Sequence, residues 1–436
     1  MSEPAPRPAS RATPFLPLVG PLARLVTHAY YRVTVAGPRP AVPGPLLLVA
    51  NHPNMVFDPL LIAAALPRPV RFLAKAPLFG IPIAGAILRL AGCLPVYRRQ
   101  DDPAQVQRNE ETFAAVTAAL AAGAAVAIFP EGTSHDAPAM TPIRTGASRI
   151  ALAAAEDRVP LTIVPVGLVM ADRDRARSEA LVVFGAPIVW DDLRGRAPAD
   201  ADAVRELTAR IGGGIEAVTV NLDAWADEPL VTTAEAIYAA THPVSRDPAD
   251  RVRRLWLATR WLRALRRSGD ERYPALAAAI RAHARRLAQL GLTPADLSEP
   301  TDLDTALRWA GRRLPLISAA GMAALGLLLV TGPMIVADLL TRRATGGRQA
   351  RATRHLFVGS ALAIGWWLAL AALAGLRWGW GVAGALVVLL PALGLVGLAV
   401  QQAWAARLHQ ARRWLLLRYG ERGRHRLLAD QAAIGG

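Results

Sequence analysis

A histidine and an aspartate stand close together in the first part of the chain, directly after a short apolar run. The run 45–48 is typical of a buried strand, and Asn51-His52-Pro53 follows it, with Asp58 six residues after the histidine. A carboxylate beside an imidazole fixes the imidazole tautomer and stabilises its protonated form. The pair is therefore a candidate general base with its orienting partner, suited to removing a proton from an alcohol. The alternative is a turn whose Asn, Pro and Asp serve only the backbone geometry.

His52 and Asp58 cannot interact if the segment between them is one regular helix. On a single α-helix the two side chains would lie about 240° apart around the axis. We therefore expect a loop or the start of a helix between them, and Pro53 suits a first helical position.

Arginines and a glutamate follow two other strand-like segments. Arg98 and Arg99 end one of them, and Glu131-Gly132 directly follows another. Because ligands of open α/β sheets bind beyond the carboxyl ends of the strands, we expect these residues to gather with His52 at one edge. Arg98 is the candidate clamp for a phosphate, with Arg99 sharing that role or lying at the surface. Glu131 and Gly132 are expected to bind substrate hydroxyls or to shape the site, unless Gly132 is a turn glycine alone.

Four further residues have side chains that are able to take part in chemistry. Lys75 and Arg144 are candidates for binding a phosphate or a pyrophosphate. Cys93 is the single cysteine, which excludes an intramolecular disulfide, and it lacks a partner that would make it a nucleophile. His135 is interpreted as a structural loop histidine. The chain has no Cys/His cluster of zinc-binding type, and we expect no metal and no cofactor.

Strands and helices alternate along residues 30–190, which we interpret as one catalytic domain. This alternation predicts an α/β fold with a mixed, mostly parallel sheet flanked by helices. Strands are expected over 31–37, 45–48, 70–74, 92–99, 124–129, 162–168 and 180–185.

The composition points to a membrane and to anionic partners. The 436 residues, enough for two or three domains, are 53% hydrophobic and have a formal net charge of +16. Basic chains bind anionic lipids, anionic substrates or nucleic acid, but no nucleic-acid-binding motif accompanies the charge, so we expect no nucleic acid. Residues 1–13 are polar and expected to be disordered. Residues 14–29 predict a helix that lies at the membrane interface or packs on the domain.

The second half of the chain is helical and then strongly apolar. Residues 191–313 are interpreted as a basic helical region, in which the helix 251–267 lies on an anionic membrane or is simply solvated. The membrane region predicted over 314–404 comprises a re-entrant segment at 314–340, bent at Gly332-Pro333, and spans at 356–376 and 380–400, with three full spans as the alternative. A basic tail follows at 405–436. The positive-inside rule then places the Arg-rich segments, and with them the active site, on the cytoplasmic side.

Four ordered motifs resemble those of the glycerophospholipid acyltransferase superfamily, whose members are PlsC-like. The resemblance covers roughly residues 30–190, and the segment 75–82 is also similar to the family. Five residues separate His52 from Asp58, where the general family pattern has four; this spacing resembles the fungal-type glycerol-3-phosphate/dihydroxyacetone-phosphate acyltransferase branch. The motifs are Asn51-His52-Pro53 with Asp58, Pro95-Val96-Tyr97-Arg98, Phe129-Pro130-Glu131-Gly132-Thr133-Ser134 and Val164-Pro165-Val166-Gly167.

The resemblance implies a membrane enzyme that transfers a fatty acyl group from acyl-CoA or acyl-ACP. The acceptor would be the sn-1 hydroxyl of glycerol 3-phosphate or dihydroxyacetone phosphate, with His52 and Asp58 as the base and its partner. A 1-acylglycerol-3-phosphate or other lysophospholipid acyltransferase is the alternative within this class. A non-catalytic membrane lipid-binding protein of the same fold is the alternative from another class.

Overall fold

The computed structural model describes residues 15–40, 44–98, 101, 103–173, 177–245, 247–302, 327–342 and 348–435, with isolated positions 304, 307, 321 and 324. The chain divides into two compact units. The first comprises residues 1–223, 247–256 and 348–350, and the second comprises 224–246, 257–347 and 351–436. The expected disordered segment 1–13 and Arg99 lie outside the described residues.

A seven-stranded sheet with the order β1-β7-β6-β2-β5-β3-β4 forms the centre of the first unit. Neighbouring strands pair in parallel except β6 and β7, which are antiparallel. The predicted mixed, mostly parallel sheet is thereby confirmed. The strands are β1 (Arg32–Ala36), β2 (Leu46–Ala50), β3 (Val70–Lys75), β4 (Leu94–Val96), β5 (Ala125–Ile128), β6 (Thr162–Met170) and β7 (Glu179–Phe184).

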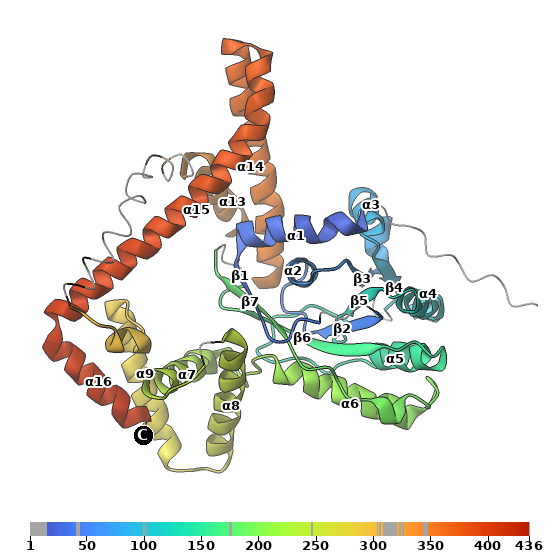
Figure 1. Ribbon diagram of the computed structural model, residues 1–436, viewed down its shortest axis with the longest axis horizontal. Coiled ribbons are helices and arrows are strands. Elements are labelled where there is room, and N and C mark those ends of the chain that lie inside the picture. The colour runs from blue at the N-terminus through green and yellow to red at the C-terminus, as the bar shows by residue number, and fades with distance from the viewer. Residues whose placement is uncertain are drawn as a thin grey trace, which may run out of the picture. The chain divides into compact units, whose positions relative to one another are not determined.

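Helices cover both faces of this sheet, as Figure 1 shows. On one face lie α1 (Leu16–Tyr30), α2 (Phe57–Ala65) and α3 (Pro82–Leu90). On the other, α4 (Asn109–Ala121), α5 (Gly146–Glu156) and α6 (Ala201–Ala217) share one buried apolar cluster with the sheet. Short 3-10 helices connect them at η1 (Ala76–Gly80), η2 (Pro103–Arg108) and η3 (Asp191–Leu193).

The first unit continues past residue 190, where the composition suggested its boundary. Helix α6 buries Leu207 and Ile211 completely, in the same cluster as Ile150 of α5. Its apolar residues recur at helical spacing, so the helix completes the core of the sheet although its sequence is charged overall. The strand-bearing domain therefore needs the first helix of the region that we interpreted as separate.

The second unit is helical throughout its described part. Helix α8 (Pro248–Arg267), predicted over 251–267, carries the chain into this unit. A π-helical turn, η6, changes to α-helix at the predicted bend Gly332-Pro333, while much of the segment before it lies outside the described residues. The elements are η4 (Trp225–Asp227), α7 (Glu228–Thr241), α9 (Arg272–Leu290), η5 (Pro294–Ser298), η6 (Leu327–Thr331), α13 (Gly332–Arg342), α14 (Arg348–Trp378), α15 (Trp380–Tyr419) and α16 (Glu421–Gly435).

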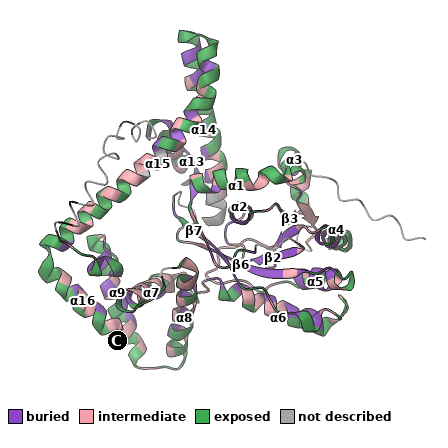
Figure 2. Ribbon diagram, viewed as in Figure 1, coloured by how far each residue is buried: buried purple, intermediate pink, exposed green. Residues whose placement is uncertain are grey.

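Two helices of the second unit are long and apolar enough to cross a membrane, over 353–378 in α14 and 380–419 in α15. Only 17% and 24% of their most apolar stretches are buried within the protein, so they are not core helices of an ordinary soluble domain. Figure 2 shows the same predominance of exposed residues along α14 and α15. The predicted span 380–400 forms only the first half of α15, which continues as one helix through the arginine-rich segment that follows.

Candidate active site

Four neighbouring parallel strands bring the candidate residues to one edge of the sheet. His52 follows β2, Glu131 follows β5, Lys75 ends β3 and Arg98 follows β4. These strands are adjacent in the order β2-β5-β3-β4, and all of them run in the same direction. Their carboxyl ends therefore meet at one edge, as the positions of the polar residues in the sequence predicted.

The imidazole of His52 lies against the carboxylate of Asp58. Nδ1 of His52 is 2.8 Å from Oδ2 of Asp58, and the ring stacks on Phe129 with centroids 4.2 Å apart. The His52 side chain keeps 17% of its surface exposed, whereas Asp58 is fully buried. With Nδ1–H donating to the carboxylate, Nε2 is the nitrogen that carries a lone pair for an incoming hydroxyl proton.

A loop followed by a helix start makes this contact possible. Helix α2 begins at Phe57, so Asp58 lies in its first turn. The expected helix start at Pro53 is wrong: Pro53 lies in a bend before the helix. The chain turns sharply at Met55, whose φ of 44° is in the left-handed region that most residues avoid. Ser134 Oγ accepts a hydrogen bond from the Met55 amide at 3.0 Å and holds this turn.

The Asp58 carboxylate is subject to opposing effects. Burial raises its pKa above the ordinary value for an aspartate. The hydrogen bond and charge of His52 act in the opposite direction, as do the amide of Asn54, which donates to Oδ2 at 2.6 Å, and the charge of Arg173. The carboxylate therefore depends on these neighbours to hold a charge in a buried position.

Glu131 is buried and its carboxylate is engaged by the protein itself. Oε1 accepts a hydrogen bond from the main-chain amide of His52 at 2.8 Å. Oε2 accepts from the amide of Thr141 at 2.7 Å and from its hydroxyl at 3.0 Å, and it also pairs with His135. Of the two roles considered for Glu131, this geometry matches shaping the site: it ties the histidine loop to the loop after β5. His135 belongs to the same network.

Arg98 reaches the loop of Glu131-Gly132, but its guanidinium already has partners. Nη1 donates to the carbonyl of Gly132 at 2.9 Å. The opposite edge forms a two-pronged pair with Asp101, at 2.6 Å from Nε and 2.5 Å from Nη2. This pair lowers the pKa of Asp101, chiefly through the hydrogen bond from Arg98. A phosphate that binds Arg98 must therefore compete with Asp101.

Two more cations lie close to Arg98 and Gly132. The side chain of Arg144 crosses over Gly132 so closely that a Cβ there would lie 2.7 Å from Arg144 Nε. Gly132 has a φ of 74°, so both its conformation and its lack of a side chain are required. Partial burial lowers the pKa of Lys75, and the charge of Arg98 lowers it further. The structure thus brings together three of the four predicted phosphate-binding cations, and the fourth, Arg99, is not described.

Sequence reasoning did not identify several residues that hold the site. The side-chain amide of Asn51 continues the pairing of β2 with β6: it accepts from the Leu168 amide at 2.8 Å and donates to the Leu168 carbonyl at 3.0 Å. Asn54, Tyr31 and Arg173 form a second set of contacts, and Asp101 neutralises Arg98. An Asn immediately before the histidine was visible as a motif residue, but its partner 117 positions away was not.

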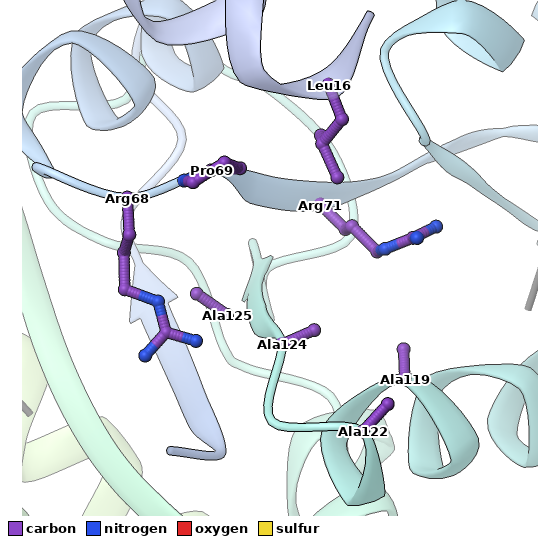
Figure 3. Close-up of a pocket in the computed structure, with 8 residues that line it drawn as sticks. All are labelled: Leu16, Arg68, Pro69, Arg71, Ala119, Ala122, Ala124 and Ala125. Carbon is purple, nitrogen blue, oxygen red and sulfur yellow. The ribbon is translucent and has the colours of Figure 1, made fainter. Parts of the chain in front are cut away.

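Two other features lie apart from this chemistry. Burial raises the pKa of the Cys93 thiol to about 11, which disfavours the thiolate that a nucleophile requires. A pocket of about 240 Å³, shown in Figure 3, includes Leu16, Arg68 and Arg71 in its lining. It lies where β3 and β5 begin, at the edge opposite His52, and Arg68 there donates to the carbonyls of Gly44 and Gly123.

The comparisons with known proteins agree with this geometry. The family model described as Acyltransferase matches residues 32–169, which include the sheet edge and all the candidate site residues. The chain carries an acyltransferase domain over residues 32–169. The predicted resemblance to this superfamily is thereby confirmed over that part of the chain.

Relatives of the acyltransferase domain differ in the acceptor that their names give. It is 34% identical over 134 residues to glycerol-3-phosphate O-acyltransferase 2 of Saccharomyces cerevisiae, covering 30% of this chain and 18% of the yeast protein. Glycerol-3-phosphate O-acyltransferase 1 of the same yeast is 33% identical, over 27% of this chain and 16% of that protein. A 1-acyl-sn-glycerol-3-phosphate acyltransferase of Chlamydomonas reinhardtii is 32% identical, over 33% of this chain and 42% of the algal protein. The chain thus matches less than half the length of each of these relatives.

Proposed function

We propose that the chain transfers a fatty acyl group from acyl-CoA or acyl-ACP to the sn-1 hydroxyl of glycerol 3-phosphate or dihydroxyacetone phosphate. The observation that carries the proposal is the contact of 2.8 Å between His52 Nδ1 and the buried Asp58, at a sheet edge that also holds Arg98, Lys75 and Arg144. The similarity to two yeast glycerol-3-phosphate acyltransferases supports the choice of acceptor.

The geometry suits direct transfer between donor and acceptor. Nε2 of His52 removes the hydroxyl proton of the acceptor, and the resulting alkoxide attacks the thioester carbonyl. The tetrahedral intermediate collapses, the carbon–sulfur bond breaks, and the leaving thiolate takes the proton back from His52. Asp58 stabilises the imidazolium while the proton resides there. The thioester is already activated, so no acyl-enzyme on Cys93 is needed.

We place the enzyme in a membrane, with its acceptor phosphate at the cations near Gly132. The two apolar helices α14 and α15 support the membrane location, and the Arg-rich segments that flank them favour an active site on the cytoplasmic side. A lipid product also suits a domain held at a bilayer.

Acylation of 1-acylglycerol 3-phosphate is the second candidate function. The algal relative, of which this chain covers a larger share than of the yeast proteins, favours it. The three acceptors share the phosphate and differ in which hydroxyl receives the acyl group, so the cation cluster serves any of them.

The test uses the purified full chain in lipid or detergent, with labelled palmitoyl-CoA and each of the three acceptors. Wild type is compared with His52→Ala. Product that depends on His52 with glycerol 3-phosphate or dihydroxyacetone phosphate supports the proposal. Product only with 1-acylglycerol 3-phosphate assigns the second candidate, and equal activity of His52→Ala with every acceptor refutes the role of His52.

A further inference from the structure

Asn54 is fully buried beside the dyad, and no step of the proposed reaction uses it. Its main-chain amide donates to Asp58 Oδ2 at 2.6 Å, so this oxygen receives hydrogen bonds from both Asn54 and His52. The other oxygen, Oδ1, is buried and has no hydrogen-bond partner among the described residues. The orientation of the whole carboxylate therefore depends on these two donors.

The side chain of Asn54 is fixed by contacts from distant parts of the chain. Nδ2 donates to the Tyr31 hydroxyl at 2.8 Å and to the carbonyl of Arg173 at 3.1 Å. The Tyr31 hydroxyl in turn donates to that same carbonyl. Because a carbonyl only accepts, this arrangement also fixes which side of the Asn54 amide carries the nitrogen.

Tyr31 holds two residues of the segment that precedes the aspartate. Its hydroxyl binds Asn54, and its ring packs edge-on against Phe57 with centroids 5.0 Å apart. Phe57 immediately precedes Asp58 and starts α2. Tyr31 itself is fully buried between α1 and β1. The loop that would otherwise be free to move between Pro53 and Phe57 is thus attached to the body of the domain.

The guanidinium of Arg173 links this group to the neighbouring loop. Nη1 lies 3.3 Å from Asp136 Oδ1, in the loop that follows Glu131. Asp58 is therefore surrounded by His52 on its own loop and by the charge of Arg173 from the connection after β6. The two loops of the site and this connection meet at Asn54 and Arg173.

We propose that Asn54, anchored by Tyr31 and the main chain of Arg173, is a positioning residue that orients the Asp58 carboxylate toward His52. The inference rests on the proposed function of His52 as the base. It also assigns a role to the longer spacing between His52 and Asp58: the loop contains a residue whose side chain anchors it and whose amide binds the carboxylate. Met55, in its left-handed conformation, turns the chain directly after this anchor.

The test compares Asn54→Ala and Tyr31→Phe with wild type and with Ser148→Ala, all as full chains. Ser148 is equally buried in the same unit, and its hydroxyl bonds Thr208 at 2.7 Å between α5 and α6. Ser148→Ala thus removes one buried hydrogen bond outside the site. The measurements are kcat, the acceptor KM and the pH dependence of kcat.

A displaced dyad lowers turnover steeply, because a shift of about 1 Å costs about 100-fold. For Asn54→Ala we expect kcat to fall about 10- to 100-fold with the acceptor KM within about two-fold. The acid limb of the pH profile of kcat should move to higher pH, since a weaker hydrogen bond from the Asn54 main-chain amide raises the pKa of Asp58 further. Tyr31→Phe should change both in the same direction by less, and Ser148→Ala should leave both unchanged.

Wild-type kcat and an unshifted acid limb in folded Asn54→Ala would overturn the inference. If Asn54→Ala does not fold, Tyr31→Phe decides by the same two criteria. His52→Ala, assayed beside them, distinguishes failure of this inference from failure of the proposed function. An inactive His52→Ala with wild-type behaviour of Asn54→Ala removes this inference alone, whereas an active His52→Ala removes the proposed base and this inference with it.

Discussion

Replacing Asp58 with asparagine tests the proposed dyad most directly, because it keeps the shape of the side chain and removes its charge. In the native site one carboxylate oxygen receives hydrogen bonds from His52 Nδ1 at 2.8 Å and from the Asn54 amide at 2.6 Å. The single oxygen of asparagine is able to accept both of these bonds but carries no charge, and in the flipped amide the NH₂ group faces Nδ1 as a donor. In Asp58→Asn the imidazole therefore loses a charged partner and a strong preference for the tautomer with a free Nε2.

The size of the effect follows from the type of contact. A hydrogen bond to a charged group is worth about 1.5–3 kcal/mol, and the imidazolium exists only after the proton has moved to His52. Loss of that contact alone slows turnover by roughly 10- to 150-fold, at about 1.4 kcal/mol for each factor of ten. The wrong tautomer adds to this, and the corresponding change in a serine protease costs about 10⁴. We expect kcat to fall by about 10² to 10⁴ while the acceptor KM stays within about three-fold.

Thermal unfolding of the same variant separates loss of chemistry from loss of fold. Burial raises the pKa of Asp58, so the carboxyl stabilises the fold below its unfolded pKa, and this contribution is lost as the pH rises through the folded pKa. Above that range the ionised form opposes folding. As the pH rises we therefore expect the unfolding temperature of wild type to fall relative to that of Asp58→Asn, which has no charge to lose or gain at this position. A folded Asp58→Asn enzyme with kcat within about three-fold of wild type would refute the dyad.

Three further predictions concern the cations and the membrane helices. Gly132→Ala should raise the acceptor KM several-fold because the new Cβ displaces Arg144. The control Gly123→Ala, with a similar φ of 79° but open space around it, should cost about 1 kcal/mol of stability and leave the acceptor KM unchanged. Equal KM values for the two variants would contradict this prediction. Asp101→Asn should lower the acceptor KM about two- to five-fold, the value of an exposed ion pair, because Arg98 is released for the phosphate; an unchanged or raised KM would show that Asp101 is no competitor. A chain ending before α14 should be released from membranes by alkaline carbonate, which a sedimentation assay measures; retention equal to that of the full chain would count against both spans.

The strands of the first unit were predictable because each one is a short apolar run bounded by turn residues. Their order in the sheet was not, since it depends on pairings such as β1 with β7, between residues about 147 positions apart in the chain. The parallel direction and the meeting of His52, Glu131 and Arg98 at one edge followed from alternation with helices alone. The role of α6 was missed because a helix that carries several charged residues still needs only one apolar stripe to complete a core.

In the site, too, the local contacts were predictable from the sequence and the contacts between distant residues were not. His52 and Asp58 are six residues apart, so their spacing carries the signal. The anchoring of Asn54 by Tyr31 and Arg173 joins positions 23 and 119 residues away, and nothing in the local sequence indicates it. Asp101 lies only three residues after Arg98, but the spacing alone does not distinguish an acidic residue that pairs with the arginine from one that faces solvent.

The pairing of Arg98 with Asp101 bears on how the acceptor is selected. An unpaired arginine would bind any phosphate or anionic headgroup that reached the sheet edge. Asp101 contacts one edge of the Arg98 guanidinium and the Gly132 carbonyl contacts the other. A phosphate that displaces Asp101 therefore gains only the difference in free energy between its own ion pair with Arg98 and the pair that it replaces. If the proposed function holds, acceptor binding then depends on the combined contribution of Arg98, Arg144 and Lys75, and so on a phosphate placed where all three reach it. That requirement favours an acceptor whose hydroxyl stands at a fixed short distance from its phosphate, as in a glycerol phosphate.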